Sequence, residues 1–279
     1  MASNLIHGTV ENEDCELHYW YQGTGPLLIF VPGGGGNGDQ YFKIMGLLDK
    51  SFTVATFDRR QMSSSKAKEN KLCNPAQNAR DIIVITKAIG RTKTSVFANS
   101  GGGILALELA ASYPEAVEHL LLHEVPTTFL LPDATFQLDR CFEIIQTYKN
   151  EGIPAAMGLF ATQLVGMGSP GDFKPDVENL HNWFQNEFLV MTLYCLDLRR
   201  IVHNKVSVAV MAGEKSKDAF YARTSIGQAE AMQCPRVVVP GNHFGFTFEA
   251  EAFAPVLIET LDMLEKRKNW DTAFKICSD

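Results

Sequence analysis

The fold is decided by the stretch Val96-Phe97-Ala98-Asn99-Ser100-Gly101-Gly102-Gly103-Ile104-Leu105-Ala106. Its first residues are typical of a buried β-strand, and its last residues are typical of a helix. Between them Ser100 is flanked by small residues, as at a sharp turn that lifts a serine hydroxyl above a sheet edge. Such a turn usually has glycine where this chain has Ala98, and Gly102 keeps the second small position. The stretch predicts a nucleophilic serine; the alternative is a glycine-rich turn with an incidental serine.

Two further strand-like segments end in residues that acyl-transfer chemistry uses. The apolar segment 27–31 runs into Gly33–Gly36, where bare backbone N–H groups can face an oxygen that gains charge. The apolar segment 237–239 is followed by a loop that contains His243. A lone histidine after a strand is usually structural. Its combination with Ser100 predicts instead a general base that activates the serine.

The carboxylate that would orient this histidine has several candidates. Glu124 follows an apolar strand segment and is expected at the same sheet edge as Ser100. Asp218 and Glu214 flank Ser216, which occupies the position after a later strand where triads commonly have an aspartate. The acid holds the histidine tautomer and stabilises the imidazolium, and geometry rather than chain position identifies it. Because serine occupies the usual aspartate position, Glu124 is the favoured acid, and Asp218 and Glu214 stay open.

Four segments resemble the α/β-hydrolases grouped around the fungal zearalenone lactonases and related bacterial hydrolases. They are the glycine-rich segment 31–36, the segment 57–63, the serine turn and the run His123-Glu124-Val125-Pro126. The order of serine before histidine along the chain is also that of α/β-hydrolases. The chain departs from the family pattern at Gln61, where glycine is usual, and at Gly33, where the lactonase has aspartate.

The resemblance implies an α/β-hydrolase fold, in which helices flank a mostly parallel twisted sheet and a helical cap is inserted. It also implies the site residues. Ser100 would be the nucleophile, His243 the base and Glu124 the acid. The oxyanion hole would be formed by the backbone N–H groups of Gly34 and Gly101. No metal and no organic cofactor is implied.

Apolar strand-like segments alternate with helical ones, which predicts a parallel sheet covered on both faces. After a hairpin over 5–22, the expected strands are 27–31, 53–57, 94–98, 118–123, 206–212 and 236–239. The expected helices that flank the sheet are 39–48, 74–90, 101–113, 219–232 and 251–268. Residues 1–126 and 206–279 should form the core domain. Residues 127–205 should form the cap, with helices near 136–149, 153–164 and 177–198.

The predicted cap indicates the kind of substrate. The resemblance is weak between Thr127 and Asn204, where substrate choice is normally made. Most large apolar side chains there should pack the cap against the core, but a cap over a catalytic rim leaves an apolar cavity. We expect Trp183 and Phe184 to line it, with Gly33 and Gly35 from the core. The expected partner is a small hydrophobic ester or lactone.

Composition excludes several classes of function. The 279 residues carry a net charge of −7 and no Lys/Arg cluster, which argues against nucleic acid and an anionic membrane surface. No apolar run reaches the roughly 18 residues of a membrane span. The six cysteines lack metal-binding spacing, and residues 1–7 lack the features of a secretory signal. We therefore expect a cytoplasmic protein with reduced thiols, and a homodimer stays open.

Three other functions fit parts of the sequence. Gly33, Gly35 and Gly38 match G-x-G-x-x-G, and Asp58 follows Gly38 by twenty residues, as in NAD(P)-binding oxidoreductases. That hypothesis does not explain Ser100 and the residues grouped with it, so it is the remote alternative. A carbon–carbon bond hydrolase would use the same three side chains. A binding protein with a hydrolase fold would keep them and turn over slowly.

Overall fold

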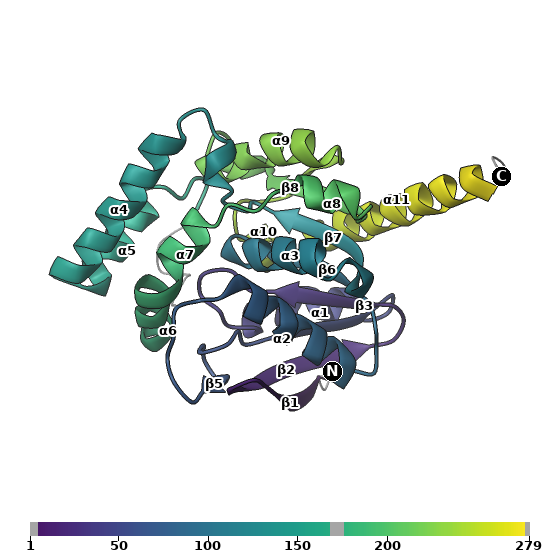
Figure 1. The fold of residues 1–279 in the computed structure, drawn as a ribbon, viewed down its shortest axis with the longest axis horizontal. Helices are drawn as coiled ribbons and strands as arrows, with labels where there is room; N and C mark the ends of the chain where they lie inside the picture. Colours follow the sequence, from purple (N-terminus) through teal and green to yellow (C-terminus); the bar gives the residue numbers. More distant parts are fainter. Residues whose placement is uncertain (1–4, 168–175, 277–279) are drawn as a thin grey trace.

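The computed structural model describes residues 5–167 and 176–276 (Figure 1). Residues 168–175, which belong to the predicted cap, lie outside the described residues. The described strands form one sheet in the order β1-β2-β4-β3-β6-β7-β8-β9, and β5 pairs with β2. Among the described helices, none is both long and apolar enough to cross a lipid bilayer.

The sheet begins with an antiparallel hairpin and continues as a parallel sheet. The hairpin strands are β1 (Ile6–Asn12) and β2 (Cys15–Gly23), and β2 pairs antiparallel with β4. The parallel strands are β3 (Leu27–Val31), β4 (Thr53–Phe57), β6 (Thr94–Asn99), β7 (Val117–His123), β8 (Val208–Gly213) and β9 (Arg236–Val239). The short strand β5 is Lys66–Ala67. Strands β3, β4, β6 and β8 are buried throughout, which explains why their sequences are nearly continuous in apolar residues. The predicted fold class is confirmed.

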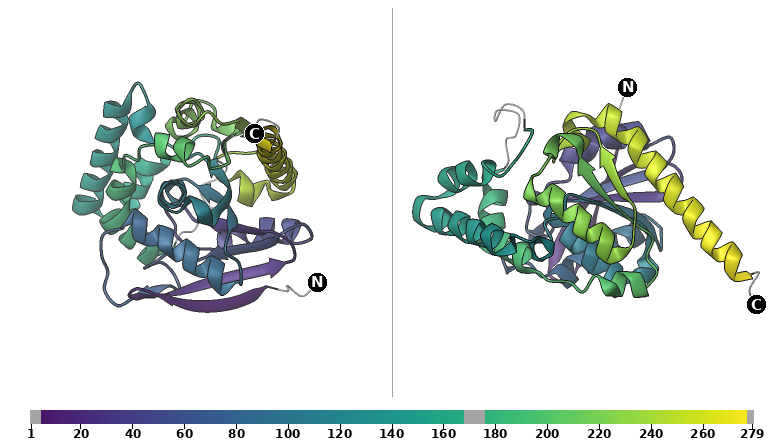
Figure 2. Two further views of the ribbon diagram at one scale, coloured as in Figure 1. Left: turned by 45° about the vertical axis from the view of Figure 1, so that its right-hand side comes forward. Right: turned by 90° about the horizontal axis from the view of Figure 1, so that it is seen from above.

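Helices cover both faces of the sheet. One face carries α1 (Phe42–Leu48), α10 (Gly245–Phe248) and α11 (Ala250–Ile276). The other carries α2 (Pro75–Ala88), α3 (Gly101–Ser112), α8 (Arg199–His203) and α9 (Phe220–Met232). Figures 1 and 2 show the end of α11 projecting beyond the rest of the molecule. Helix α11 runs to Ile276, further than the predicted 251–268.

A helical segment separates β7 from β8. It contains α4 (Ala134–Glu151), α5 (Ile153–Ala161), α6 (Val177–Asn182), the π-helical turn η5 (Trp183–Glu187) and α7 (Phe188–Leu193). Figure 2 shows these helices gathered at the side of the molecule away from the end of α11. The continuous helix expected over 177–198 is thus interrupted at η5 and ends at Leu193. Beyond it, Leu196 and Ile201 pack in the main core cluster, so the last part of 127–205 lies against the core.

Candidate active site

Ser100 lies at the sharp turn between β6 and α3. Its backbone angles are φ 54° and ψ −132°, a region that residues with a Cβ rarely adopt. The Ser100 N–H donates to the carbonyl of His123 at 3.0 Å, and the Ser100 carbonyl accepts from Gly103 at 2.9 Å. These two hydrogen bonds hold the strained residue between neighbouring elements. The predicted turn therefore has the backbone strain that is found at functional sites.

Small residues are required around this turn because α3 approaches β3 very closely. A Cβ on Gly102 would lie 2.5 Å from the carbonyl oxygens of Val31 and Pro32. A Cβ on Gly103 would lie 2.0 Å from a methyl group of Val125. The triple glycine thus lets α3 begin directly above the sheet.

His243 and Glu124 form a buried hydrogen-bonded pair. The Nδ1 atom of His243 lies 2.7 Å from Oε2 of Glu124, although 119 positions separate the two residues. The other carboxylate oxygen of Glu124 accepts the N–H of Gly213, at the end of β8, at 2.8 Å. Glu124 itself adopts φ 51°, so the chain turns sharply where β7 ends. Both carboxylate oxygens are therefore satisfied, and one of them faces the imidazole.

The electrostatics of this pair favour an ionised carboxylate. Burial raises the pKa of Glu124, but the field of His123 and the hydrogen bond with His243 outweigh burial and lower it to about 2. Glu124 is consequently charged near neutral pH. The other acid candidates lie elsewhere: Glu214 and Asp218 are exposed, and only Ser216 between them is buried. The structure brings Glu124, and neither Glu214 nor Asp218, to His243.

Two backbone amides lie in the same cavity as the serine. Gly34 and Gly101 line it together with Ser100 and His243. Within residues 5–167 and 176–276, neither glycine N–H donates a hydrogen bond. Neither N–H group is therefore engaged by another part of the described chain, which is a condition for an oxyanion hole.

The space around Ser100 consists of two adjoining hollows, both of which Ser100, His243 and Gly34 line. The apolar hollow encloses about 590 Å³, including its open mouth. Its apolar lining comprises Pro126, Phe160, Leu164, Trp183, Phe188, Met191, Phe220 and Tyr221. The other hollow, the wide hollow, encloses about 1500 Å³ with its open part and has a mixed lining. Its polar residues include Asn37, Asp39, Ser63, Asp176 and Thr247, and its apolar residues include Met157, Phe160, Leu164, Leu180, Phe244 and Phe248. A substrate would therefore meet apolar side chains in both hollows and additional polar groups in the wide one.

Of the four residues expected to contact substrate, three line the hollows and one does not. Trp183 borders both hollows and packs on Gly34, where a Cβ would come within 2.6 Å of its ring. Gly33 and Gly35 line the wide hollow. Phe184 lines neither hollow, in contrast to the expectation. It is buried in an apolar cluster of the helical segment between β7 and β8, where its ring stacks on that of Tyr148 at a centroid distance of 5.1 Å. Of these two adjacent aromatic residues, only Trp183 lines the hollows around the serine.

Several residues around the site were not assigned to it from the sequence. The Nδ2 atom of Asn99, next to the serine, lies 3.0 Å from Nδ1 of His123 and 3.2 Å from the carbonyl oxygen of His243. Burial lowers the pKa of His123 to about 4, so its ring is neutral near pH 7. Asn99 thus links the strand before the serine to the loop that carries His243. The sequence carries no signal for this role, because its partners lie far along the chain.

The side chains that a dinucleotide site would need form hydrogen bonds and ion pairs with other residues of the protein. Asp58 accepts the N–H groups of Gly38 and Ser64 at 2.8 and 2.9 Å. Arg59 is buried against Glu187, and Arg60 is buried against Asp81. Neither arginine is exposed for a 2′-phosphate, which argues against the NAD(P) hypothesis.

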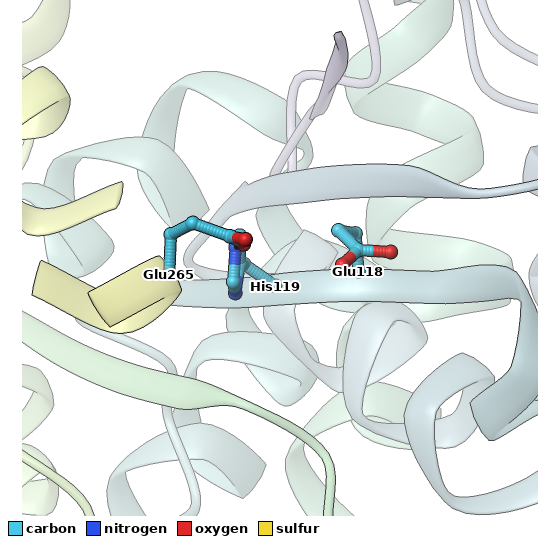
Figure 3. Close-up of side chains that lie close together, drawn as sticks. All are labelled: Glu118, His119 and Glu265. Carbon is cyan, nitrogen blue, oxygen red and sulfur yellow. The ribbon is translucent and has the colours of Figure 1, made fainter. Parts of the chain in front are cut away.

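A histidine and two glutamates gather at the opposite end of β7. Figure 3 shows Glu118 and His119, at the start of the strand, beside Glu265 of α11, with potential ligand atoms within 4.8 Å of one another. The ring nitrogens of His119 lie 3.0 Å from Glu265 and 3.0 Å from Ser207, and Glu118 forms an ion pair with Lys268. These contacts join α11 to the sheet, which accounts for the cluster without a metal ion.

Comparisons with known proteins agree with this architecture. The model of the alpha/beta hydrolase fold family matches residues 26–182, more than half of the chain. A zearalenone hydrolase of Cladophialophora bantiana is 30% identical over 266 residues, which are 93% of this chain and 98% of that protein. An uncharacterised hydrolase of Bacillus subtilis (strain 168) is 25% identical over 270 residues, 95% of this chain and 98% of the relative. The chain therefore belongs to the α/β-hydrolase family, as the sequence resemblance predicted.

A solved structure extends the same likeness to three dimensions. The enol-lactonase from Burkholderia xenovorans LB400 superposes with a TM-score of 0.70 at 16% identity, over 91% of this chain and all of that one. At this identity the superposition establishes the fold alone. On the family match and the two sequence relatives, the protein is a hydrolase of the α/β class.

Proposed function

We propose that the protein is a serine hydrolase that cleaves a carboxylic ester or lactone of a small hydrophobic molecule. The observation that carries this proposal is the buried hydrogen bond between His243 and Glu124, because His243 lines the same cavity as Ser100. The names of two similar proteins, a zearalenone hydrolase and an enol-lactonase, support a substrate of the ester or lactone type.

The geometry supports the following sequence of steps. Because Nδ1 of His243 donates to Glu124, Nε2 carries the lone pair that accepts the Ser100 proton. The serine oxygen attacks the carbonyl carbon and forms a tetrahedral intermediate. The N–H groups of Gly34 and Gly101 stabilise its oxyanion, and each such donor is typically worth about 3 kcal/mol. His243 then protonates the leaving alcohol, and water hydrolyses the acyl-enzyme.

The linings of the two hollows favour a largely apolar substrate. An apolar group fits beside Trp183, Phe188 and Met191 in the apolar hollow. The wide hollow adds further apolar side chains, together with polar groups that could bind oxygens of the substrate. In a lactone, the leaving alcohol stays tethered to the acyl group.

A covalent probe tests the assignment of the nucleophile. A fluorophosphonate should label the wild-type protein, and the protein should hydrolyse p-nitrophenyl acetate. Ser100→Ala should lose both properties and keep its circular-dichroism spectrum. The matched control is Ser112→Ala, at the other end of the same helix, which should retain labelling and turnover. Labelling or turnover at wild-type level in Ser100→Ala would refute the proposal.

A further inference from the structure

The buried ion pair between Arg59 and Glu187 has no part in the chemistry described above. Both side chains are almost completely buried, with exposed fractions of 0% and 2%. Two hydrogen bonds of 2.9 and 2.7 Å join the guanidinium to the two carboxylate oxygens. Removing two charges from water is costly, and such a pair persists only where further hydrogen bonds satisfy it. The remaining bonds of Arg59 therefore show what the pair does.

Those remaining bonds go to the glycine loop beside the serine. Nε and Nη2 of Arg59 donate to the carbonyl oxygen of Gly33, at 3.2 and 2.8 Å. The backbone N–H of Arg59 donates to the carbonyl of Gly36 at 2.8 Å. Arg59 thus fixes both ends of the loop, once through its side chain and once through its backbone.

The carbonyl of Gly33 belongs to the same peptide group as the N–H of Gly34. In a trans peptide these two bonds point in opposite directions within one plane, and the described residues contain no cis peptide. Glycine flanks this plane on both sides, so no Cβ opposes its rotation. The plane is held instead by the hydrogen bonds that the Gly33 carbonyl accepts, from Arg59 and from the N–H of Gly36 at 3.0 Å. A guanidinium that holds the carbonyl on one side therefore holds the N–H on the other, where Gly34 lines the cavity with Ser100.

We propose that Arg59 is a positioning residue that directs the Gly34 N–H toward the oxyanion, and that Glu187 neutralises Arg59 in this task. This inference rests on the proposed serine-hydrolase function. Glu187 lies in the same π-helical turn as Trp183, which packs on Gly34. The turn thus contacts the loop directly through Trp183 and indirectly through the pair of Glu187 with Arg59, so that the helical segment and the oxyanion amide are placed together.

Kinetics of Arg59→Lys test the inference, because one ammonium group cannot reproduce the guanidinium contacts to both Gly33 and Glu187. We expect kcat to fall by on the order of 10²-fold, as when one oxyanion donor is lost. KM should change little, since the amide acts on the transition state. The matched control is Arg60→Lys: Arg60 is also buried and pairs with Asp81 at 2.7 Å, but its hydrogen bonds go elsewhere. Its kcat should stay within a few-fold of wild type.

Inhibitor affinities separate a positioning role from a structural one. An aryl trifluoromethyl ketone forms a tetrahedral adduct with the serine, whereas the corresponding methyl ketone binds mainly as a ground-state analogue. In Arg59→Lys, affinity for the trifluoromethyl ketone should fall by about the same factor as kcat, and affinity for the methyl ketone should be unchanged. An unchanged ratio of the two affinities would overturn the inference.

The double variant Arg59→Met/Glu187→Met keeps the test decisive if the lysine variant does not fold. Replacing a buried ion pair by apolar residues of similar volume is often neutral for stability. We expect a folded protein that has the same losses of kcat and of trifluoromethyl ketone affinity. If this variant had the wild-type kcat and Ser100→Ala were inactive, the inference about Arg59 would be overturned and the proposed function would stand. Activity in Ser100→Ala would instead refute the proposed function itself.

Discussion

Glu124 supplies its carboxylate from the end of β7, whereas Asp218 near the end of β8 is exposed. Glu124→Gln keeps the size of the side chain but removes the charge that stabilises the imidazolium. We expect kcat for p-nitrophenyl acetate to fall by on the order of 10³- to 10⁴-fold. Asp218→Asn is the control and should retain kcat within about two-fold. Severe loss in Asp218→Asn, with activity kept in Glu124→Gln, would exchange the two assignments.

His123 gives the fold a defined dependence on pH. Its pKa falls from 6.5 to about 4 because burial penalises the charged ring. The folded state therefore binds fewer protons than the unfolded state between these values, and stability is lost as pH falls through this window. The loss should reach about 3 kcal/mol, at roughly 1.4 kcal/mol per pH unit.

Urea unfolding at a series of pH values measures this loss. His123→Phe keeps a ring among the surrounding aromatic side chains and removes the titrating group. The free energy of unfolding of this variant should change less between pH 6.5 and 4 than that of the wild type. Equal slopes in the two proteins would assign the pH dependence to other groups.

The sequence could predict the proposed catalytic residues because most of them follow strands. Carboxyl ends of parallel strands meet at one sheet edge, so chain position alone places Ser100 and Glu124 near each other. The ion pair of Arg59 with Glu187 could not be predicted in this way. Its members lie 128 positions apart, and their contact depends on how the π-helical turn packs over the glycine loop.

At the scale of elements, the close approach of α3 to β3 leaves no space for a larger side chain at Gly102. Gly102→Ala would place a Cβ 2.5 Å from two backbone carbonyls, which cannot move without displacing the strand. We expect a loss of stability of about 1–3 kcal/mol, the usual cost of overpacking, together with loss of activity. Thermal unfolding and p-nitrophenyl acetate turnover measure the two effects.

Gly158→Ala is the matched control, because Gly158 lies within α5 and a Cβ there has nothing within 4 Å. Its replacement by alanine should raise stability by up to about 1 kcal/mol, since alanine is the better helix former. If Gly102→Ala and Gly158→Ala were equally stable, the close contact between α3 and β3 would not limit the side chain at Gly102.

The elements themselves were predictable to differing extents. Strands β3, β4 and β9 coincide with their predicted ranges, because buried parallel strands are short apolar runs between breakers. The π-helical turn was not predicted, since its register is set by the contacts of Trp183 and Glu187 rather than by local propensity. Tertiary packing overrides local preference there.

At the scale of the whole molecule, apolar clusters join the segment between β7 and β8 to the sheet. Met62, which follows β4, packs in the cluster formed by α4, α6 and η5. Conversely, Met191 and Leu196 of the segment between β7 and β8 pack in the main core cluster, which the sheet forms with the helices on one of its faces. Hydrogen bonds add to this contact: Asn179 of α6 accepts from the Ser63 N–H at 2.7 Å and donates to the Gly35 carbonyl at 2.8 Å.

Shared clusters of this kind imply that the helical segment and the sheet unfold together. Differential scanning calorimetry should show one transition, with equal calorimetric and van't Hoff enthalpies. Asn179→Ala removes the hydrogen bonds to the loops after β3 and β4, and should lower the midpoint of that single transition without splitting it. The side chain is buried, so a loss of about 1–3 kcal/mol is expected. Two resolved transitions in the wild-type protein would show instead that the helical segment unfolds as a separate unit. The link from Glu187 through Arg59 to the glycine loop would then have to persist after the segment has lost its contact with the core.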